Sequence, residues 1–309
     1  IILVVVTIFL IFIIAFSFKK EDSNKIVVSE VTHSVFYSPW YVALENKYFE
    51  SVGLDIEVVL TPGADKVASS VISGDANIGF SGPEATVYVY NNSNEKLVTF
   101  ASLTKRDGQF IVGDCKYKNN FSILDLKGKK VLAGRSGGMP LLMFKYALKE
   151  SNIDEKDVII DTSIDFASLT GAYISGQGDF VNLFEPNALK IEKEGSGCVL
   201  SSLGNISGTV PYTAFYAKEN YIKKNKDVIK KFNEALNKGL EFVHKNDAKT
   251  IANAIKSQFS DTSIEDLITI VERYKSADSW YNTTYINKKD YNRLLDIMIY
   301  ESKYWWFNN

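Results

Sequence analysis

From Lys25 onward, short runs typical of β-strands alternate with segments whose apolar residues recur at helical spacing. This alternation is typical of βαβ units, which build mainly parallel sheets enclosed by helices. The first series of expected elements comprises strands at 25–31, 54–60 and 77–80 and helices that begin at Pro39 and Ala64. The sequence therefore predicts an α/β fold.

A second series of the same kind begins after residue 108. Its expected elements are strands at 130–133, 158–160 and 180–184, a helix that opens at 137–140 and a helix at 166–175. Residues 211–217 read as a strand that returns to the first series, and only helical spacing follows. The chain thus crosses between two lobes twice, near 109–113 and near 211–217, and two crossings make a hinge.

The length of 309 residues also favours two lobes, because single hydrophobic cores stop growing at about 250 to 300 residues. We expect lobe one to comprise residues 25–113 and 211–309, with the C-terminal helices packed on it. Lobe two should comprise residues 114–210. Residues 1–18 are a candidate signal peptide or membrane anchor, and residues 19–24 are a polar spacer.

The segment 1–18 is almost wholly Ile, Leu, Val and Phe. As a helix it would span about 27 Å, just short of a hydrocarbon core of about 30 Å. Ala15 and Ser17 give a small-x-small pattern that a signal peptidase accepts, whereas no Cys follows for lipid attachment. We expect export, with the protein periplasmic or on the outer face of the cytoplasmic membrane. A buried helix of a soluble domain is the weaker alternative.

Charge and soft ligands limit the function. Lys and Arg number 35 against 37 Asp and Glu, a formal net charge of −2, whereas nucleic-acid binding requires a basic surface. We expect no nucleic-acid partner. The chain has two His and two Cys, none at zinc-site spacing, so we expect no metal and no cofactor.

The two cysteines, Cys115 and Cys198, leave two alternatives open. In an exported chain they can pair in a disulfide. We favour two free buried thiols, because a chain of this size needs no covalent crosslink to be stable.

Ligands of open parallel sheets bind outside the carboxyl ends of the strands, so the segments that follow the expected strands should line the cleft. The candidate ligand-binding residues are His33, Phe36, Tyr37, Trp40, Gly82, Pro83, Glu84, Arg106, Arg135, Gly137, Gly138, Met139, Phe184, Glu185 and Tyr212. The aromatic side chains of this set can hold a flat ring between them. The glycine amides and Arg135 can hold an anion.

Several candidates have a structural alternative. Trp40 can fill the core, Glu84 can complement a helix dipole, and His33 can be a loop residue whose hydrogen bonds are satisfied. Arg135 can be solvated or paired across the lobes. The glycine-rich string at 134–140 lacks the Lys and the Ser or Thr of a phosphate loop, so nucleotide hydrolysis has no support.

Three motifs occur in order: SPWYVA at residues 38–43, GDANIG at 74–79 and LKGKKV at 126–131. They resemble motifs of the solute-binding proteins that serve importers of nitrate, sulfonates and thiamine pyrimidine precursors, a family that includes the yeast-type pyrimidine synthase. The resemblance implies a periplasmic-binding-protein fold of the second type, with two α/β lobes joined by a two-segment hinge. It also implies capture of a small solute in the cleft and delivery to an ABC permease, and we expect a monomer.

Four hypotheses on function follow. The first is a binding protein for a small heteroaromatic solute such as a thiamine-precursor pyrimidine, since Glu84 and Glu185 can accept hydrogen bonds from an exocyclic amine. The second is a binding protein for an alkylsulfonate, taurine or nitrate at Arg135 and the adjacent glycine amides. The third, a pyrimidine synthase that consumes His33 with iron, is weakened because the cysteine-rich iron motif is absent. An extracellular sensor domain would require a further membrane segment or signalling domain. We therefore expect no enzyme.

Overall fold

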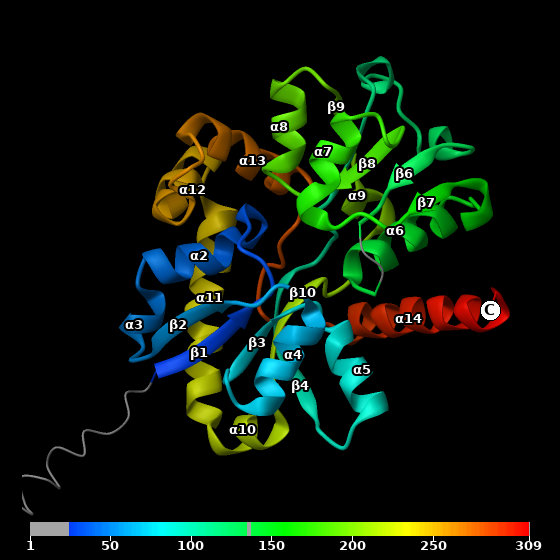
Figure 1. Ribbon diagram of the computed structural model, residues 1–309. Coiled ribbons are helices and arrows are strands. Elements are labelled where there is room, and N and C mark those ends of the chain that lie inside the picture. Colours follow the sequence, from blue (N-terminus) through cyan, green and yellow to red (C-terminus); the bar gives the residue numbers. More distant parts are fainter. Residues whose placement is uncertain (1–24, 135–136, 309) are drawn as a thin grey trace, which may run out of the picture.

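The computed structural model describes residues 25–134 and 137–308. These residues form two five-stranded sheets with helices packed around them (Figure 1). The predicted α/β architecture is thereby confirmed, and the chain passes from the first sheet to the second and back again.

The first sheet has the strand order β2-β1-β3-β10-β4. Its strands are β1 (Lys25–Glu30), β2 (Asp55–Leu60), β3 (Ile78–Ser81), β4 (Leu97–Thr104) and β10 (Thr213–Lys218). β1 pairs in parallel with β2 and β3, so the carboxyl ends of these three strands meet at one edge. β10 pairs antiparallel with β3 and β4. The expected strands and the returning strand are confirmed, whereas β4 was not expected.

Helices cover the first sheet. They are α2 (Ser38–Glu45), α3 (Tyr48–Ser51), α4 (Ala64–Ser73), α5 (Glu84–Asn92), α10 (Glu219–Lys224), α11 (Lys226–Lys245), α12 (Ala248–Ile255) and α13 (Ile264–Ser276). α11 contacts α2, and at Gly239 the two backbones touch, since a Cβ there would lie 2.1 Å from the carbonyl oxygen of Pro39. This contact holds α2 in place at the end of β1.

The second sheet has the strand order β7-β6-β8-β5-β9. Its strands are β5 (Phe110–Gly113), β6 (Lys130–Leu132), β7 (Ile159–Asp161), β8 (Phe180–Leu183) and β9 (Cys198–Ser202). Its helices are α6 (Met139–Glu150), α7 (Leu169–Ile174), α8 (Asn187–Lys193) and α9 (Leu203–Ser207). β5, which a lobe boundary at residue 113 assigns to lobe one, pairs with β8 and β9. The chain therefore enters the second sheet at Phe110.

Two short segments, 105–109 and 208–212, link the sheets. They lie side by side, because the N–H of Val210 donates to the carbonyl oxygen of Lys105 over 3.0 Å. Single 3₁₀ turns complete the fold: η1 (Val35–Tyr37), η2 (Cys115–Tyr117), η3 (Ile123–Leu126), η4 (Glu155–Asp157), η5 (Phe166–Ser168) and η6 (Lys256–Phe259). Paired linkers of this kind are the geometry of a hinge.

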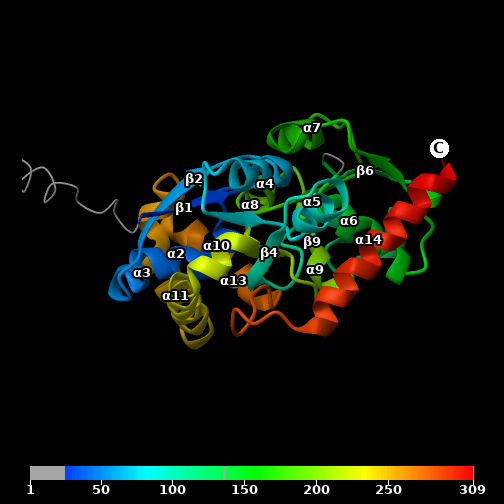
Figure 2. The ribbon, with the colours of Figure 1, turned by 90° about the horizontal axis from the view of Figure 1, so that it is seen from below.

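The last helix, α14 (Lys288–Asn308), does not stay on lobe one. It contacts α6 of the second lobe, and Figure 2 shows it running past α9 and α6. The guanidinium group of Arg293 donates to the carbonyl oxygens of Thr209 (3.1 Å) and Ser207 (2.9 Å). The expected packing on lobe one holds for α11 and α12, which contact α2, while α14 bridges the lobes.

Cys115 and Cys198 form a disulfide, so the favoured interpretation of two free thiols is wrong. The pairing follows from the sheet: β5 and β9 are antiparallel neighbours, and Gly113 lies opposite Cys198. Cys115, two residues beyond Gly113, is brought to a Cα–Cα distance of 4.9 Å from its partner, within the range that a disulfide spans.

Among residues 25–134 and 137–308, no helix has the length and apolar character needed to span a bilayer. The apolar segment 1–18 and the spacer 19–24 lie outside the described residues.

Candidate functional site

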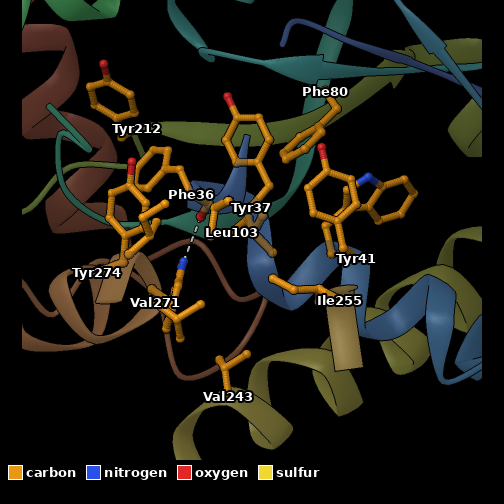
Figure 3. Packing of buried hydrophobic residues seen from close by; sticks show 14 of the residues in the cluster. Phe36, Tyr37, Tyr41, Phe80, Leu103, Tyr212, Val243, Ile255, Val271 and Tyr274 are labelled. Atoms are coloured by element: carbon orange, nitrogen blue, oxygen red, sulfur yellow. Dashed lines mark hydrogen bonds between the residues drawn. The ribbon is translucent and has the colours of Figure 1, made fainter. Parts of the chain in front are cut away.

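The aromatic residues after β1 lie where the two lobes meet. Ser34 caps η1, its hydroxyl accepting the N–H of Phe36 over 3.2 Å. The Phe36 ring then packs against rings from three other elements: Phe184 after β8 at 5.9 Å, Tyr212 in the second linker at 5.8 Å and Tyr274 in α13 at 5.1 Å. Figure 3 shows the rings of Phe36, Tyr212 and Tyr274 beside Tyr37. The structure thus brings Phe36, Phe184 and Tyr212 together across the lobes.

Tyr37 extends this cluster toward the first sheet. Its ring lies 4.5 Å from that of Phe80 in β3. Burial raises the pKa of the Tyr37 hydroxyl most, a hydrogen bond with Thr213 acts to lower it, and the carboxyl groups of Glu30 and Glu84 raise it further. The phenol therefore stays neutral, with Glu84 within electrostatic reach.

Trp40 is a core residue. It is fully buried, and its ring packs against Phe49 at 5.2 Å and Phe215 at 5.3 Å. Its indole N–H donates to Oε2 of Glu30 over 2.9 Å. The side chain therefore has no free polar group to offer a solute.

His33 lies at the outer side of the same loop and is partly exposed. One ring nitrogen is 2.9 Å from the hydroxyl of Tyr41 and the other is 2.9 Å from the carbonyl oxygen of Gln258. The ring stacks on Phe259. A hydrogen bond with Glu30 raises the His33 pKa most, against a smaller lowering effect of burial. His33 is thus a loop histidine whose ring nitrogens are both engaged.

Glu84 opens α5 with its carboxyl group buried at 1% exposure. A glycine precedes it at Gly82 for a steric reason, because a Cβ there would lie 2.0 Å from Oε2 of Glu84. Burial raises the Glu84 pKa to about 7, although the backbone N–H groups of Glu84, Met139 and Ala85 act to lower it. Met139 begins α6 of the second lobe, so this carboxyl group faces both lobes. Oε2 has no hydrogen-bond partner among the described residues.

Asp107, in the first linker, is a second buried carboxyl that the sequence analysis missed. Oδ1 accepts the N–H of Gln109 over 2.7 Å. Burial raises the Asp107 pKa to about 8, while that N–H and the Tyr212 hydroxyl act to lower it. The hydroxyl is close, yet not in hydrogen-bonding geometry: within the described part of the chain, neither Oδ2 nor the Tyr212 oxygen has a partner. The candidate beside it, Arg106, points to Asp278 instead, at 3.2 Å.

Gln109 and Asn182 add further unpaired polar atoms. The Gln109 side chain donates to the backbone carbonyl oxygen of Asn182 over 3.3 Å. Both side-chain atoms of Asn182 and Oε1 of Gln109 are buried without a hydrogen bond to any described residue. Because buried polar groups are nearly always hydrogen-bonded, these unpaired donors and acceptors of the first linker and β8 mark a candidate solute site. Their residue types gave no signal, since Gln and Asn are more often exposed than buried.

The second-lobe candidates divide into two groups. Gly138 precedes α6 and Gly137 has a φ of 88°, but Arg135 lies outside the described residues. Glu185 is buried, yet both of its carboxylate oxygens are taken: one accepts from Arg273 and the other accepts the Leu189 N–H over 2.8 Å. Glu185 therefore anchors α8. Among the first-lobe candidates, Pro83 only precedes α5.

Within the described ranges, no three His, Cys, Asp or Glu side chains lie close enough to hold a metal ion.

Comparison with known proteins gives a consistent result. The model of the family described as NMT1/THI5 like matches residues 36–250. The putative binding protein YtlA of Bacillus subtilis (strain 168) is 40% identical over 294 residues, which are 94% of this chain and 88% of that protein.

Among solved structures, the periplasmic aliphatic sulphonate binding protein SsuA of Escherichia coli aligns with a TM-score of 0.69 at 16% identity, covering 90% of this chain and 92% of that one. The periplasmic nitrate-binding protein NrtA of Synechocystis PCC 6803 aligns with a TM-score of 0.61 at 13% identity, covering 80% and 69%. These likenesses confirm the expected periplasmic-binding-protein fold of the second type.

Proposed function

Because the chain belongs to the NMT1/THI5-like family, we propose that it is an extracytoplasmic solute-binding protein of an ABC importer. It captures one small solute between its lobes and delivers it, as a monomer, to a permease in the membrane. The name of its relative and the fold it shares with importer components support this function. The disulfide between Cys115 and Cys198 supports an oxidising compartment outside the cytoplasm.

The proposed lobes meet at the two linkers, 105–109 and 208–212. This division assigns β5 to lobe two with its hydrogen-bonded neighbours. Rotation about the paired linkers would open the space between Phe36 and Phe184, whose rings come from different lobes. Residues 1–18 would direct export or anchor the protein.

The proposed solute is a small heteroaromatic molecule of the thiamine-precursor pyrimidine type. The single observation that carries this choice is the buried carboxyl group of Glu84 near the phenols of Tyr37 and Tyr212, next to the contact of Phe36 with Phe184. Phe36 and Phe184 can hold a flat ring between them. A carboxylate accepts hydrogen bonds from an exocyclic amine, whereas it repels an oxyanion.

A thermal-shift series tests the proposal, with aminopyrimidines, alkylsulfonates, taurine and nitrate as probes. A solute at 100 times its Kd adds about 2.7 kcal/mol to the free energy of unfolding, which corresponds to roughly 4 to 5 °C for a chain of this size. We expect an aminopyrimidine to give this shift. Shifts with sulfonates or nitrate alone would instead support the oxyanion alternative at Arg135 and the glycine amides.

Phe184→Leu should reduce the shift, because Phe184 is only partly buried and leucine keeps its apolar contacts but not a flat face. Tyr285→Leu is the matched control, since Tyr285 is 74% exposed. Equal shifts for both variants would contradict the role of the aromatic pair.

A further inference from the structure

Asp107 is the strongest feature that the proposed function leaves unused. It is 1% exposed although it lies in a linker between lobes. Its backbone is enclosed as well, because a Cβ on Gly204 of α9 would lie 2.3 Å from the Asp107 carbonyl oxygen. One carboxyl oxygen, Oδ1, is held by the Gln109 N–H, so the other, Oδ2, has a fixed direction and no hydrogen bond to a described residue.

Asp107 and Glu84 share one surrounding. The Tyr212 hydroxyl interacts electrostatically with Asp107, with Glu84 and with the Tyr37 hydroxyl. Both carboxyl groups and the Tyr37 phenol therefore lie within electrostatic reach of the Tyr212 hydroxyl. Among the described residues, no Lys or Arg is a cause of the pKa shift of either carboxyl group. Neither carboxylate is therefore neutralised by a Lys or Arg of the described residues.

An uncompensated buried carboxylate is costly, and the cost falls when a donor or a cation reaches it. Two such groups around the Tyr212 hydroxyl favour a solute with two donor groups or a positive charge and disfavour an anion. We propose that Asp107 is a second specificity-determining residue of the solute site, and that together with Glu84 it selects a cationic amino-substituted nitrogen heterocycle. This inference rests on the proposed function of the cleft.

A proton balance follows from this arrangement. Burial raises the pKa of Glu84 to about 7 and that of Asp107 to about 8, so near pH 7 Asp107 is largely protonated and Glu84 is about half protonated. A bound cation stabilises the carboxylate forms and lowers both pKa values, so binding releases roughly one proton to the buffer. Affinity for a cation of fixed charge therefore increases from pH 6 to pH 8.5.

The experiment is isothermal titration calorimetry in buffers of different ionisation enthalpy, with three flat probes of similar size. They are 1-methyl-4-aminopyridinium, a permanent cation, 4-aminopyrimidine, which is neutral at pH 7, and pyridine-4-carboxylate, an anion. For the wild-type protein we expect the cation to bind at least tenfold more tightly than the neutral probe, with proton release, and the anion to bind more weakly than both.

Asp107→Asn keeps the shape of the side chain and removes its charge. We expect at least tenfold weaker binding of the cation and less proton release, with little change for the neutral probe. Asp114→Asn is the matched control, since its carboxyl group is well exposed; it should bind all three probes like the wild-type protein. Melting curves of both variants report whether they fold.

The results distinguish a failure of the proposed heteroaromatic function from a failure of the role of Asp107. If no probe binds the wild-type protein, the heteroaromatic function is wrong and the inference falls with it. If the neutral probe or the anion binds as tightly as the cation, or if Asp107→Asn binds the cation unchanged, the heteroaromatic function stands and the role of Asp107 is overturned.

Discussion

Gly82 leaves the space that the Glu84 carboxyl group occupies. The carboxyl group of Glu84 folds back over the backbone of Gly82, where a side chain would collide with it. The absence of a Cβ at residue 82 therefore decides where a carboxyl two positions away can lie.

Gly82→Ala should move the Glu84 carboxyl group without unfolding the protein. The new Cβ would lie 2.0 Å from Oε2, which is the end of a flexible side chain and can shift. We expect at least a tenfold loss of solute affinity, measured by calorimetry, with a melting temperature within about 3 °C of the wild-type value. Gly171→Ala is the control, because its Cβ would meet nothing within 4 Å. Unchanged affinity in Gly82→Ala would contradict the role of Glu84.

Asp107 also predicts a pH dependence of stability. Its folded-state pKa of about 8 lies above the unfolded value of 3.8. The folded state therefore binds the proton of Asp107 more tightly than the unfolded state does. This proton binding adds its full amount to the free energy of unfolding below about pH 4, and the added stability is lost as the pH rises through about 8. Asp107→Asn cannot ionise at residue 107. The melting temperature of the variant minus that of the wild type should therefore be at least about 4 °C larger at pH 9 than at pH 5. A constant difference over this range would show that Asp107 ionises freely.

The sequence could predict those site residues whose position follows from a strand end. Phe36, Tyr37 and Glu84 each come just after a strand whose carboxyl end faces the other lobe. Trp40 also follows β1, but its indole N–H donates to Glu30 of the same lobe. No local sequence pattern predicts that hydrogen bond. Asp107 and Asn182 were missed because residues far apart in the sequence bury them.

At the level of elements, α13 and α8 hold the lobes together through ion pairs. The Arg273 guanidinium group donates to Glu185 and to Glu192 of the other lobe. At the exposed side, Lys193 reaches Asp266 over 2.7 Å. The first set involves a buried carboxylate and the second does not, so their energetic weights differ.

Arg273→Met should destabilise the protein by about 3 kcal/mol, because it leaves the Glu185 carboxylate buried without its cation. Lys193→Met breaks the exposed pair and should cost at most about 1 kcal/mol. Urea unfolding followed by circular dichroism measures both values. Equal losses for the two variants would mean that Glu185 is solvated or protonated.

The helix-and-strand alternation predicted most elements because each parallel βαβ unit carries its own local signal. The strands β4 and β9 were not expected, and both pair only antiparallel with a strand remote in sequence. Such pairing does not by itself hide a strand, because β10 pairs in the same way and was expected. The position of α14 was also beyond local reasoning. Its apolar spacing shows that one face is buried, but it does not say against which lobe.

For the whole molecule, the disulfide closes a loop of 83 residues that contains most of lobe two. In the chain-entropy account a loop of this length is worth about 4 kcal/mol, through restriction of the unfolded state. Cys115→Ser with Cys198→Ser should therefore lower the free energy of unfolding by about that amount, and dithiothreitol should have the same effect on the wild-type protein.

The double variant is its own control, since dithiothreitol should leave its unfolding curve unchanged. Free thiols in the unreduced wild-type protein, measured by a thiol-reactive dye under denaturing conditions, would show that the disulfide does not form.

The place of β10 in the middle of the first sheet imposes an order on biogenesis. The strands of the second sheet, residues 110–202, emerge from the ribosome as one continuous stretch. The first sheet stays incomplete until residues 213–218 insert between β3 and β4, strands made more than a hundred residues earlier. Long-range pairing of this kind is slow. The lobe whose synthesis begins first is thus the last to be finished, and the edges of β3 and β4 that face β10 stay unpaired until residues 213–218 are made.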